Sequence, residues 1–110
     1  MKTIAVDFDG VIHRYSRGWQ DGRIYDEPVE GALEALAKLV ANGYKVVIFT
    51  TRARDAAQIQ AINDWLLERM PNWDSFESIE VTDRKPGAIA YIDDRAIRFT
   101  NWTDILRYYT

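Results

Sequence analysis

Residues 3–10 have the sequence TIAVDFDG, a short apolar run that ends in two aspartates and a glycine. A continuous apolar run of this length between polar residues is typical of a strand buried on both faces of a parallel sheet. Residues 45–50, KVVIFT, show the same pattern more strongly because they are rich in β-branched side chains. Both runs end in polar residues, so they predict a parallel sheet with polar groups at the ends of its strands.

Helical patterns and weaker strands alternate with these two runs. Apolar residues recur at helical spacing after residue 30, and Asn42-Gly43 supplies a stop signal. Asp55 can cap a second helix, which Pro71 closes. The expected elements are helices at 30–41 and 55–70, strands at 3–8, 45–50, 78–81, 88–92 and 97–99, and a last helix that Thr103 caps and whose Ile105, Leu106 and Tyr109 face inward.

This alternation of strands and helices with short links indicates right-handed βαβ crossovers and a parallel sheet. We therefore predict an α/β protein with a three-layer Rossmann-like fold, in which helices cover both faces of the sheet. The length of 110 residues fits one domain, 1–110. Residues 11–27, here named the flap, contain the turn signal Asp21-Gly22 and predict a short β-hairpin after the first strand.

The composition is that of a globular protein, with 47% hydrophobic and 28% charged residues. The chain has no cysteine, which excludes disulfides, thiolate nucleophiles and zinc–thiolate sites. No apolar run is long enough for a membrane span, and Asp7 and Asp9 interrupt any signal peptide, so we expect a cytoplasmic protein. The net charge of −3 does not favour a nucleic-acid partner.

Four aspartates stand at predicted strand ends: Asp7 and Asp9 after the first strand, Asp93 and Asp94 after the fourth. In a parallel α/β sheet these ends meet at one crevice, where ligands bind. Carboxylates this close repel one another, and a hard divalent cation relieves the repulsion. Oxygen ligands without His or Cys favour Mg²⁺, which also takes a phosphate oxygen. The sequence therefore predicts a magnesium site and a phosphorylated substrate.

The same crevice is expected to hold groups for phosphoryl transfer. A carboxylate is a competent nucleophile toward phosphorus, and a second carboxyl two residues on can protonate the leaving oxygen and then deprotonate water. Lys85 is expected to neutralise phosphate charge, and the hydroxyl of Thr50, or alternatively Thr51, to bond a phosphoryl oxygen. Arg52 is either a substrate contact or a solvated loop residue, and Gly10 lets the backbone turn close to the ligand.

Four segments together resemble the haloacid dehalogenase (HAD) superfamily of hydrolases. Residues 7–11, DFDGV, resemble its first motif, and the apolar strand that ends at Thr50 resembles the second. Lys85-Pro86 resembles the third motif, and the acidic pair at residues 93–94 after an apolar strand resembles the fourth. The four stand in the family's order over nearly the whole chain, which is far more specific than any one of them alone.

The resemblance implies a role for each matching residue. Asp7 is the expected nucleophile and a metal ligand, and Asp9 is the expected general acid/base, with its backbone carbonyl also on the metal. Asp93 ligates Mg²⁺, with Asp94 ligating it directly or through water. The expected catalytic residues are Asp7, Asp9, Thr50 and Lys85, the substrate-binding residues are Gly10, Thr50, Thr51, Arg52 and Lys85, and the metal ligands are Asp7, Asp9, Asp93 and Asp94.

The chain leaves no room for the cap domain that HAD enzymes commonly carry, so it resembles a capless member with the flap as its one candidate lid. The implied activity is that of a Mg²⁺-dependent phosphatase that cleaves a phosphomonoester through an aspartyl-phosphate. The expected substrate is a small phosphate ester, and the site would then be covered by a neighbouring subunit of a homo-oligomer. A nucleotide or nucleic-acid end at an open site is the alternative and is less favoured. A non-catalytic or phosphoreceiver-type binding domain is a third, weaker hypothesis.

Overall fold

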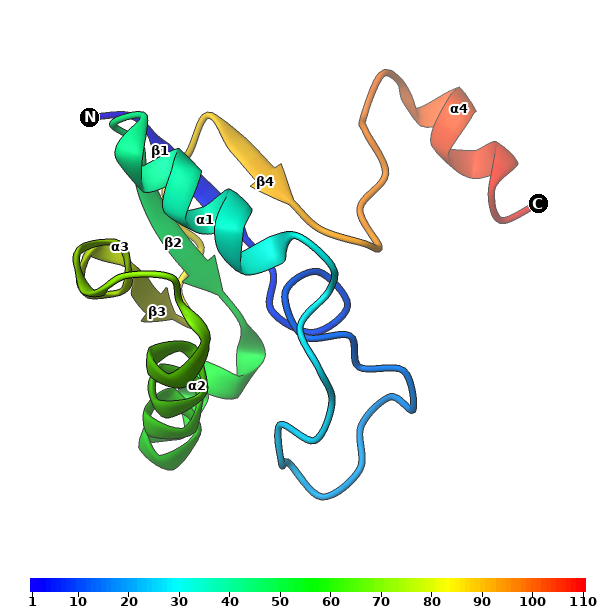
Figure 1. Ribbon diagram of the computed structural model, residues 1–110. Helices are drawn as coiled ribbons and strands as arrows, with labels where there is room; N and C mark the ends of the chain where they lie inside the picture. The colour runs from blue at the N-terminus through cyan, green and yellow to red at the C-terminus, as the bar shows by residue number, and fades with distance from the viewer.

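The computed structural model describes residues 1–110, and its centre is a parallel sheet of four strands (Figure 1). The strands are β1 (Thr3–Val6), β2 (Lys45–Phe49), β3 (Glu80–Thr82) and β4 (Ala90–Ile92). Their order across the sheet is β3-β2-β1-β4, with every neighbouring pair parallel. The predicted α/β class, Rossmann-like and without a cap domain, is confirmed.

Three helices pack on one face of this sheet: α1 (Ala32–Ala41), α2 (Ala56–Arg69) and α3 (Trp73–Ser78). The strand order explains the placement. The connections from β1 to β2 and from β2 to β3 step the same way across the sheet, and right-handed crossovers then put their helices on the same side. The return from β3 to β4 is the helix-free segment 83–89.

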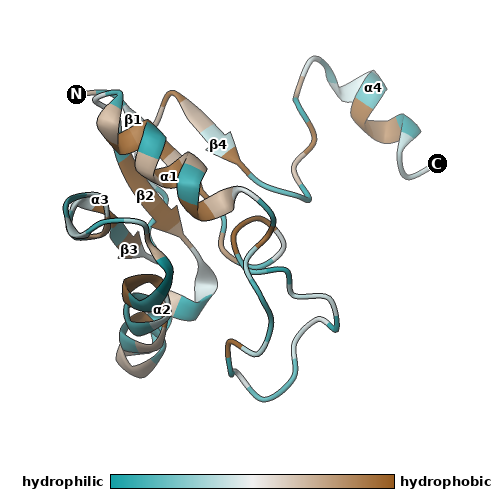
Figure 2. Ribbon diagram, viewed as in Figure 1, coloured by the Kyte–Doolittle hydropathy of each residue, from teal (hydrophilic) through white to brown (hydrophobic).

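The core lies between this helical layer and the sheet. Alternate residues of the central strands, such as Ile4 and Val46, belong to this core, and β2 is apolar from its second residue to its end (Figure 2). Burial of these side chains supplies the main stabilisation of the fold. The core side chains are Ile4, Val6, Phe8, Ile12, Leu33, Leu36, Val46, Ile48, Ile62, Trp65 and Leu66.

Local sequence signals account for the start of α2, the helix that follows β2 and the 3-10 turn after it. Asp55 caps α2 as predicted, because its carboxylate accepts a hydrogen bond of 2.9 Å from the Ala57 N–H. The short helix α3 was not predicted, although Asn72 caps it in the same way by accepting from the Ser75 N–H. The strand expected at 78–81 consequently begins later, at Glu80.

The flap is not the β-hairpin expected from the sequence. One antiparallel bridge, His13 to Pro28, joins its two ends, and the residues between are irregular. Side chains hold this segment in place of a ladder of backbone hydrogen bonds. The Tyr25 hydroxyl donates to the Gly18 carbonyl, and the Ser16 hydroxyl donates to the Asp26 carboxylate.

The C-terminal segment also differs from the prediction. Residues 97–99 form no strand, and α4 (Trp102–Arg107) is capped by Asn101 rather than Thr103. No residue of α4 is buried, and the helix stands apart from the sheet at the end of a long connection (Figure 1). Trp102 packs edge-on against Phe99, with ring centroids 5.5 Å apart, in place of the expected packing on the sheet. The second face of the sheet therefore lacks the helical layer that the three-layer prediction placed there.

None of the helices has the length and apolar character that a membrane crossing requires.

Candidate active site

A cavity of about 300 Å³ opens at the carboxyl ends of three adjacent strands. Because β1 lies between β2 and β4, the residues that follow these strands come together although they are far apart in the sequence. Crevices at this end of an open parallel sheet are the usual ligand sites of such folds. The lining residues are Asp7, Asp9, Tyr15, Phe49, Thr50, Thr51, Asp93, Asp94 and Arg95.

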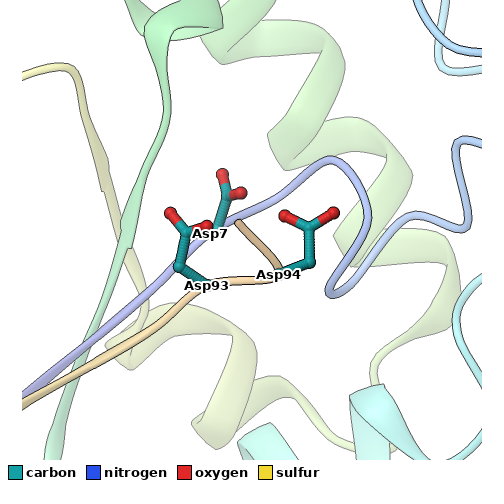
Figure 3. Close-up of side chains that lie close together, drawn as sticks. All are labelled: Asp7, Asp93 and Asp94. Atoms are coloured by element: carbon teal, nitrogen blue, oxygen red, sulfur yellow. The ribbon is translucent and has the colours of Figure 1, made fainter. Parts of the chain in front are cut away.

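Three carboxylates converge at one side of the cavity. Asp7 follows β1, while Asp93 and Asp94 follow β4, and the three side chains point the same way (Figure 3). One carboxylate oxygen of each lies within 4.8 Å of those of the other two. The backbone fixes this arrangement: the Asp7 N–H donates to the Ile92 carbonyl, and the Arg95 N–H donates to Asp93 Oδ1.

The crowding changes the acidity of Asp7. Burial raises the pKa of its carboxyl from 3.8 to about 6, and the nearby charges of Asp93, Asp94 and Asp9 add to the rise. The Phe8 N–H donates to Asp7 Oδ1 at 2.8 Å, which lowers the pKa but does not offset burial. The negative charge on Asp7 is therefore costly unless a cation joins the cluster.

The donor set fits a hard divalent cation such as Mg²⁺. All three candidate ligands are carboxylate oxygens from short, fixed backbone segments, and none of the three side chains forms an ion pair with a basic residue. Asp93 and Asp94 are exposed, so the open side has room for water and substrate oxygens, which Mg²⁺ commonly retains.

Gly10 is the residue that lets the two parts of the site approach. Its φ is +87°, a backbone conformation that residues other than glycine rarely adopt. A Cβ built on Gly10 would meet the carboxylate of Asp94. The sequence-based expectation for Gly10 was a close approach to the ligand, and the structure shows a close approach to a candidate metal ligand.

Asp9 lies in the cavity wall but apart from the three-carboxylate cluster. Its Oδ2 accepts a 2.7 Å ion-pair hydrogen bond from Arg52 Nε, and its Oδ1 lies 2.9 Å from His13 Nδ1. The side chain is 19% exposed, so it contacts both the interior and the cavity. The structure thus separates two kinds of aspartate, a crowded cluster and a single carboxylate with its own counter-charge.

Thr50 and Thr51 both line the cavity, as expected. The buried Thr50 Oγ1 accepts from the Arg52 N–H at 3.3 Å as the cap of the 3-10 turn Thr51–Arg54, which leaves its hydroxyl proton free to donate. Thr51 is exposed. Either hydroxyl can serve as a donor to an oxygen in the cavity.

Three expected site residues do not line the cavity: Gly10, which contacts Asp94 instead, and the two basic residues Lys85 and Arg52. Lys85 is exposed, and its Nζ lies 4.8 Å from the ring centroid of Tyr91 in β4. Arg52 is buried behind Asp9, so the reading of Arg52 as a solvated loop residue is wrong. Lys85 belongs to segment 83–89, which runs from the end of β3 back to the start of β4, where the Ile89 N–H donates to the Thr3 carbonyl.

Three lining residues were not singled out as site residues from the sequence: Phe49 at the end of β2, Tyr15 and Arg95. Tyr15 adopts φ +57° in the flap, and burial and the Asp9 charge raise the pKa of its phenol, which keeps it a hydrogen-bond donor. Arg95 brings a guanidinium to the rim. Its position directly after Asp94 was the available signal, whereas nothing in the sequence marks Tyr15.

Comparison with known proteins gives two informative matches among solved structures. A conserved protein from Bacteroides thetaiotaomicron matches with 26% identity and a TM-score of 0.59, over 94% of this chain and 85% of that one. A D,D-heptose 1,7-bisphosphate phosphatase from B. bronchiseptica, solved with magnesium and phosphate, matches with 26% identity and a TM-score of 0.51. The match covers 99% of this chain but 64% of the phosphatase. No family model and no curated protein sequence matches.

The phosphatase is a HAD enzyme, so the protein is HAD-like in fold, as its four sequence segments predicted. The similarity also supports the broad class of a phosphohydrolase.

Proposed function

We propose that residues 1–110 form a single hydrolase domain that cleaves a phosphomonoester with the help of Mg²⁺ and through an aspartyl-phosphate on Asp7. The observation that supports this most is the convergence of Asp7, Asp93 and Asp94 within 4.8 Å, beside a separate Asp9. A mechanism with a nucleophile, a metal site and an acid/base requires this division of carboxylates.

In the proposed reaction an oxygen of Asp7 attacks phosphorus, and the bond from phosphorus to the ester oxygen breaks. Asp9 donates the proton that the leaving oxygen takes. Water then attacks the phosphorus of the aspartyl-phosphate, Asp9 accepts its proton, and the bond to Asp7 breaks to release inorganic phosphate. The two-residue spacing puts both side chains in one cavity, where the same carboxyl can act first as acid and then as base.

Mg²⁺ held by Asp7, Asp93 and Asp94, with the Asp9 backbone carbonyl as a further candidate ligand, would neutralise charge on the phosphoryl oxygens and on the carboxylates. The protein's own donors to those oxygens are the hydroxyls of Thr50 and Thr51, which line the same cavity.

Two basic residues are candidates for the phosphate-binding cation, Lys85 and Arg95. Lys85 lies over Tyr91, and Tyr91 pairs with Ala5, two residues before Asp7 on the same face of the sheet. The lysine therefore needs to swing from that ring to reach a bound phosphate. Arg95 already lines the cavity and is the nearer candidate for holding the substrate.

A small phosphate ester is the better-supported substrate class. The cavity of about 300 Å³ is small, and the matched phosphatase acts on a sugar bisphosphate by its name. A nucleic-acid end would need free basic side chains on the flap. Arg14 pairs with Glu27 and Arg23 pairs with Asp21, so these charges are engaged locally.

The proposal is tested by hydrolysis of p-nitrophenyl phosphate in Mg²⁺ and in EDTA. Wild-type protein should turn over with Mg²⁺ alone, and Asp7→Asn should lower kcat by about 1,000-fold or more because it removes the nucleophile. Asp74→Asn is the matched control, an exposed aspartate in α3 that should behave as wild type. Equal activity of Asp7→Asn and wild type would show that the assignment of Asp7 is wrong.

A further inference from the structure

Arg52 is a buried arginine whose side chain is only 2% exposed and joins three separate segments. Its Nε donates to Asp9 Oδ2 at 2.7 Å, and its Nη1 donates to the Gly22 carbonyl at 2.8 Å and to Gln58 Oε1 at 3.1 Å. A buried charge is strongly destabilising unless it is paired and hydrogen-bonded, and here Asp9 supplies the pair. The segment that follows β1, the flap and α2 therefore meet at one guanidinium.

His13 holds the other oxygen of Asp9 and is itself fully buried. The backbone N–H of Asp26 donates to His13 Nε2 at 3.0 Å. Because a backbone N–H can only donate, Nε2 has no proton, and the ring proton is on Nδ1. Nδ1–H therefore donates to Asp9 Oδ1 at 2.9 Å. Ring contacts with Phe8 and other aromatic residues fix the plane of the imidazole.

Both oxygens of Asp9 thus accept hydrogen bonds from behind the cavity wall, and both donors depend on the flap. Arg52 donates to the Gly22 carbonyl of the flap, and His13 is itself a flap residue that accepts from the Asp26 N–H. A carboxylate oxygen can accept two hydrogen bonds, so each oxygen retains a position for a proton donor in the cavity. The Asp9 carboxylate therefore cannot rotate freely, and the side that faces the cavity can still exchange a proton with a bound substrate or water.

We propose that Arg52 and His13 are positioning residues that aim the Asp9 carboxylate at the reacting oxygen, and that a docked flap is required for this aim. The inference rests on the proposed function, because it concerns the acid/base of that reaction. It replaces the expectation that Arg52 contacts substrate. Small displacements of a reacting group are costly, about 100-fold in rate for a 1 Å misplacement.

Arginine suits this position for a geometric reason. Its planar fork reaches Asp9, the Gly22 carbonyl and Gln58 at once, whereas a lysine ammonium keeps the charge but cannot span the same three acceptors. Arg52→Lys therefore separates positioning from charge. Arg54, exposed in the same 3-10 turn, gives the matched control Arg54→Lys.

The first test is steady-state hydrolysis of p-nitrophenyl phosphate with Mg²⁺, after circular dichroism has shown that each variant is folded. Arg52→Lys should lower kcat by about 10- to 100-fold with KM, and inhibition by inorganic phosphate, changed less than about 3-fold. Arg54→Lys should match wild type. A higher KM with an unchanged kcat would instead show a substrate contact and overturn the proposal.

A double-mutant cycle tests whether Arg52 acts through Asp9. In an Asp9→Asn background, Arg52→Lys should change the residual kcat by less than about 2-fold, because the group it positions is already gone. If Arg52→Lys lowers kcat by the same factor in the Asp9→Asn background as in wild type, the two residues act independently and the proposal is overturned.

The flap gives a readout that needs neither metal nor turnover. Trp19 in the flap lies with its ring centroid 5.3 Å from Arg52 Cζ. The Trp19→Phe variant identifies the part of the tryptophan fluorescence that comes from Trp19. Acrylamide quenching of that part should increase in Arg52→Lys and stay unchanged in Arg54→Lys. Unchanged quenching would overturn the docking role. If wild type instead shows no Mg²⁺-dependent turnover at all, the proposed function is wrong. The quenching result and the turnover result thus distinguish failure of this inference from failure of the proposed function.

Discussion

Asp7 is the side chain whose surroundings most oppose its charge. Its pKa is raised from 3.8 to about 6, first by burial and then by neighbouring carboxylates. Between these two values the folded protein binds more protons at this group than the unfolded chain does. The stability of the metal-free protein therefore falls as pH rises through this window, and the loss is complete above pH 6.

Asp7→Asn should consequently stabilise the metal-free protein at pH 7.5. A shift of about two pKa units corresponds to about 3 kcal/mol, but partial solvent access reduces this, and we expect on the order of 1 kcal/mol, or about 5 °C in Tm. Mg²⁺ should raise the Tm of wild type and leave that of Asp7→Asn unchanged. Thermal unfolding in EDTA and in Mg²⁺ measures both, and a less stable Asp7→Asn in EDTA would contradict the account.

Gly10→Ala should disturb the metal site through Asp94. The added Cβ collides with the Asp94 carboxylate, and the positive φ adds backbone strain. Gly18→Ala is the control, since Gly18 also has a positive φ but an open surrounding. We expect Mg²⁺ affinity, measured by calorimetry, to fall about 10-fold or more in Gly10→Ala alone. Equal losses in both variants would show that strain, not the contact with Asp94, matters.

The sequence predicted which carboxylates would meet, because their positions follow from strand ends. Asp7, Asp93 and Asp94 cluster, and Asp9 shares their cavity. It could not predict the surroundings of Arg52, since its partners at Gly22 and Gln58 depend on how an irregular loop docks. Short-range patterns fix strands and helices but not such side-chain-mediated contacts.

Among the elements, α2 matters most for the site because it anchors the turn that follows β2. Asp55→Ala should remove the cap hydrogen bond to the Ala57 N–H and cost about 1 kcal/mol, or about 4–8 °C in Tm. Asp55→Ser keeps a capping oxygen and should melt close to wild type. Thermal unfolding decides, and equal losses in the two variants would indicate that the cap contributes nothing.

The elements that were predicted correctly have strong periodic or apolar patterns. α1 and α2 bury side chains at helical spacing, and β1 and β2 bury consecutive apolar residues, so both patterns are readable along the chain. The short α3 and the flap were missed or misassigned because each is stabilised by a few local hydrogen bonds. Asn72 and Asp26, which supply such bonds, belong to residue types that also favour ordinary turns.

The whole molecule is a sheet with a helical layer on one face and an outlying helix. The expected packing of α4 failed because nothing in the periodicity of residues 102–107 specifies a surface to pack against. Apolar residues between positions 99 and 109 are exposed, and α4 carries apolar side chains away from the core (Figure 2). The largest are Phe99, Trp102, Leu106, Tyr108 and Tyr109.

Removal of residues 101–110 should therefore leave the core intact. Since no side chain of α4 is buried, we expect Tm to change by less than about 3 °C in dilute solution. Circular dichroism melts of both chains at several concentrations provide the measurement. A large drop in Tm would show that α4 is covered in solution, and a concentration-dependent drop would identify a second copy as the cover.

The central claim, that Asp7 becomes phosphorylated during turnover, can be tested by trapping. Wild-type protein is mixed with Mg²⁺ and p-nitrophenyl phosphate, quenched in acid and treated with sodium borohydride, which reduces an acyl phosphate to an alcohol. Peptide mass spectrometry should then find homoserine at position 7, dependent on substrate. Turnover without this conversion, or conversion at Asp9, Asp93 or Asp94 instead, would contradict the account.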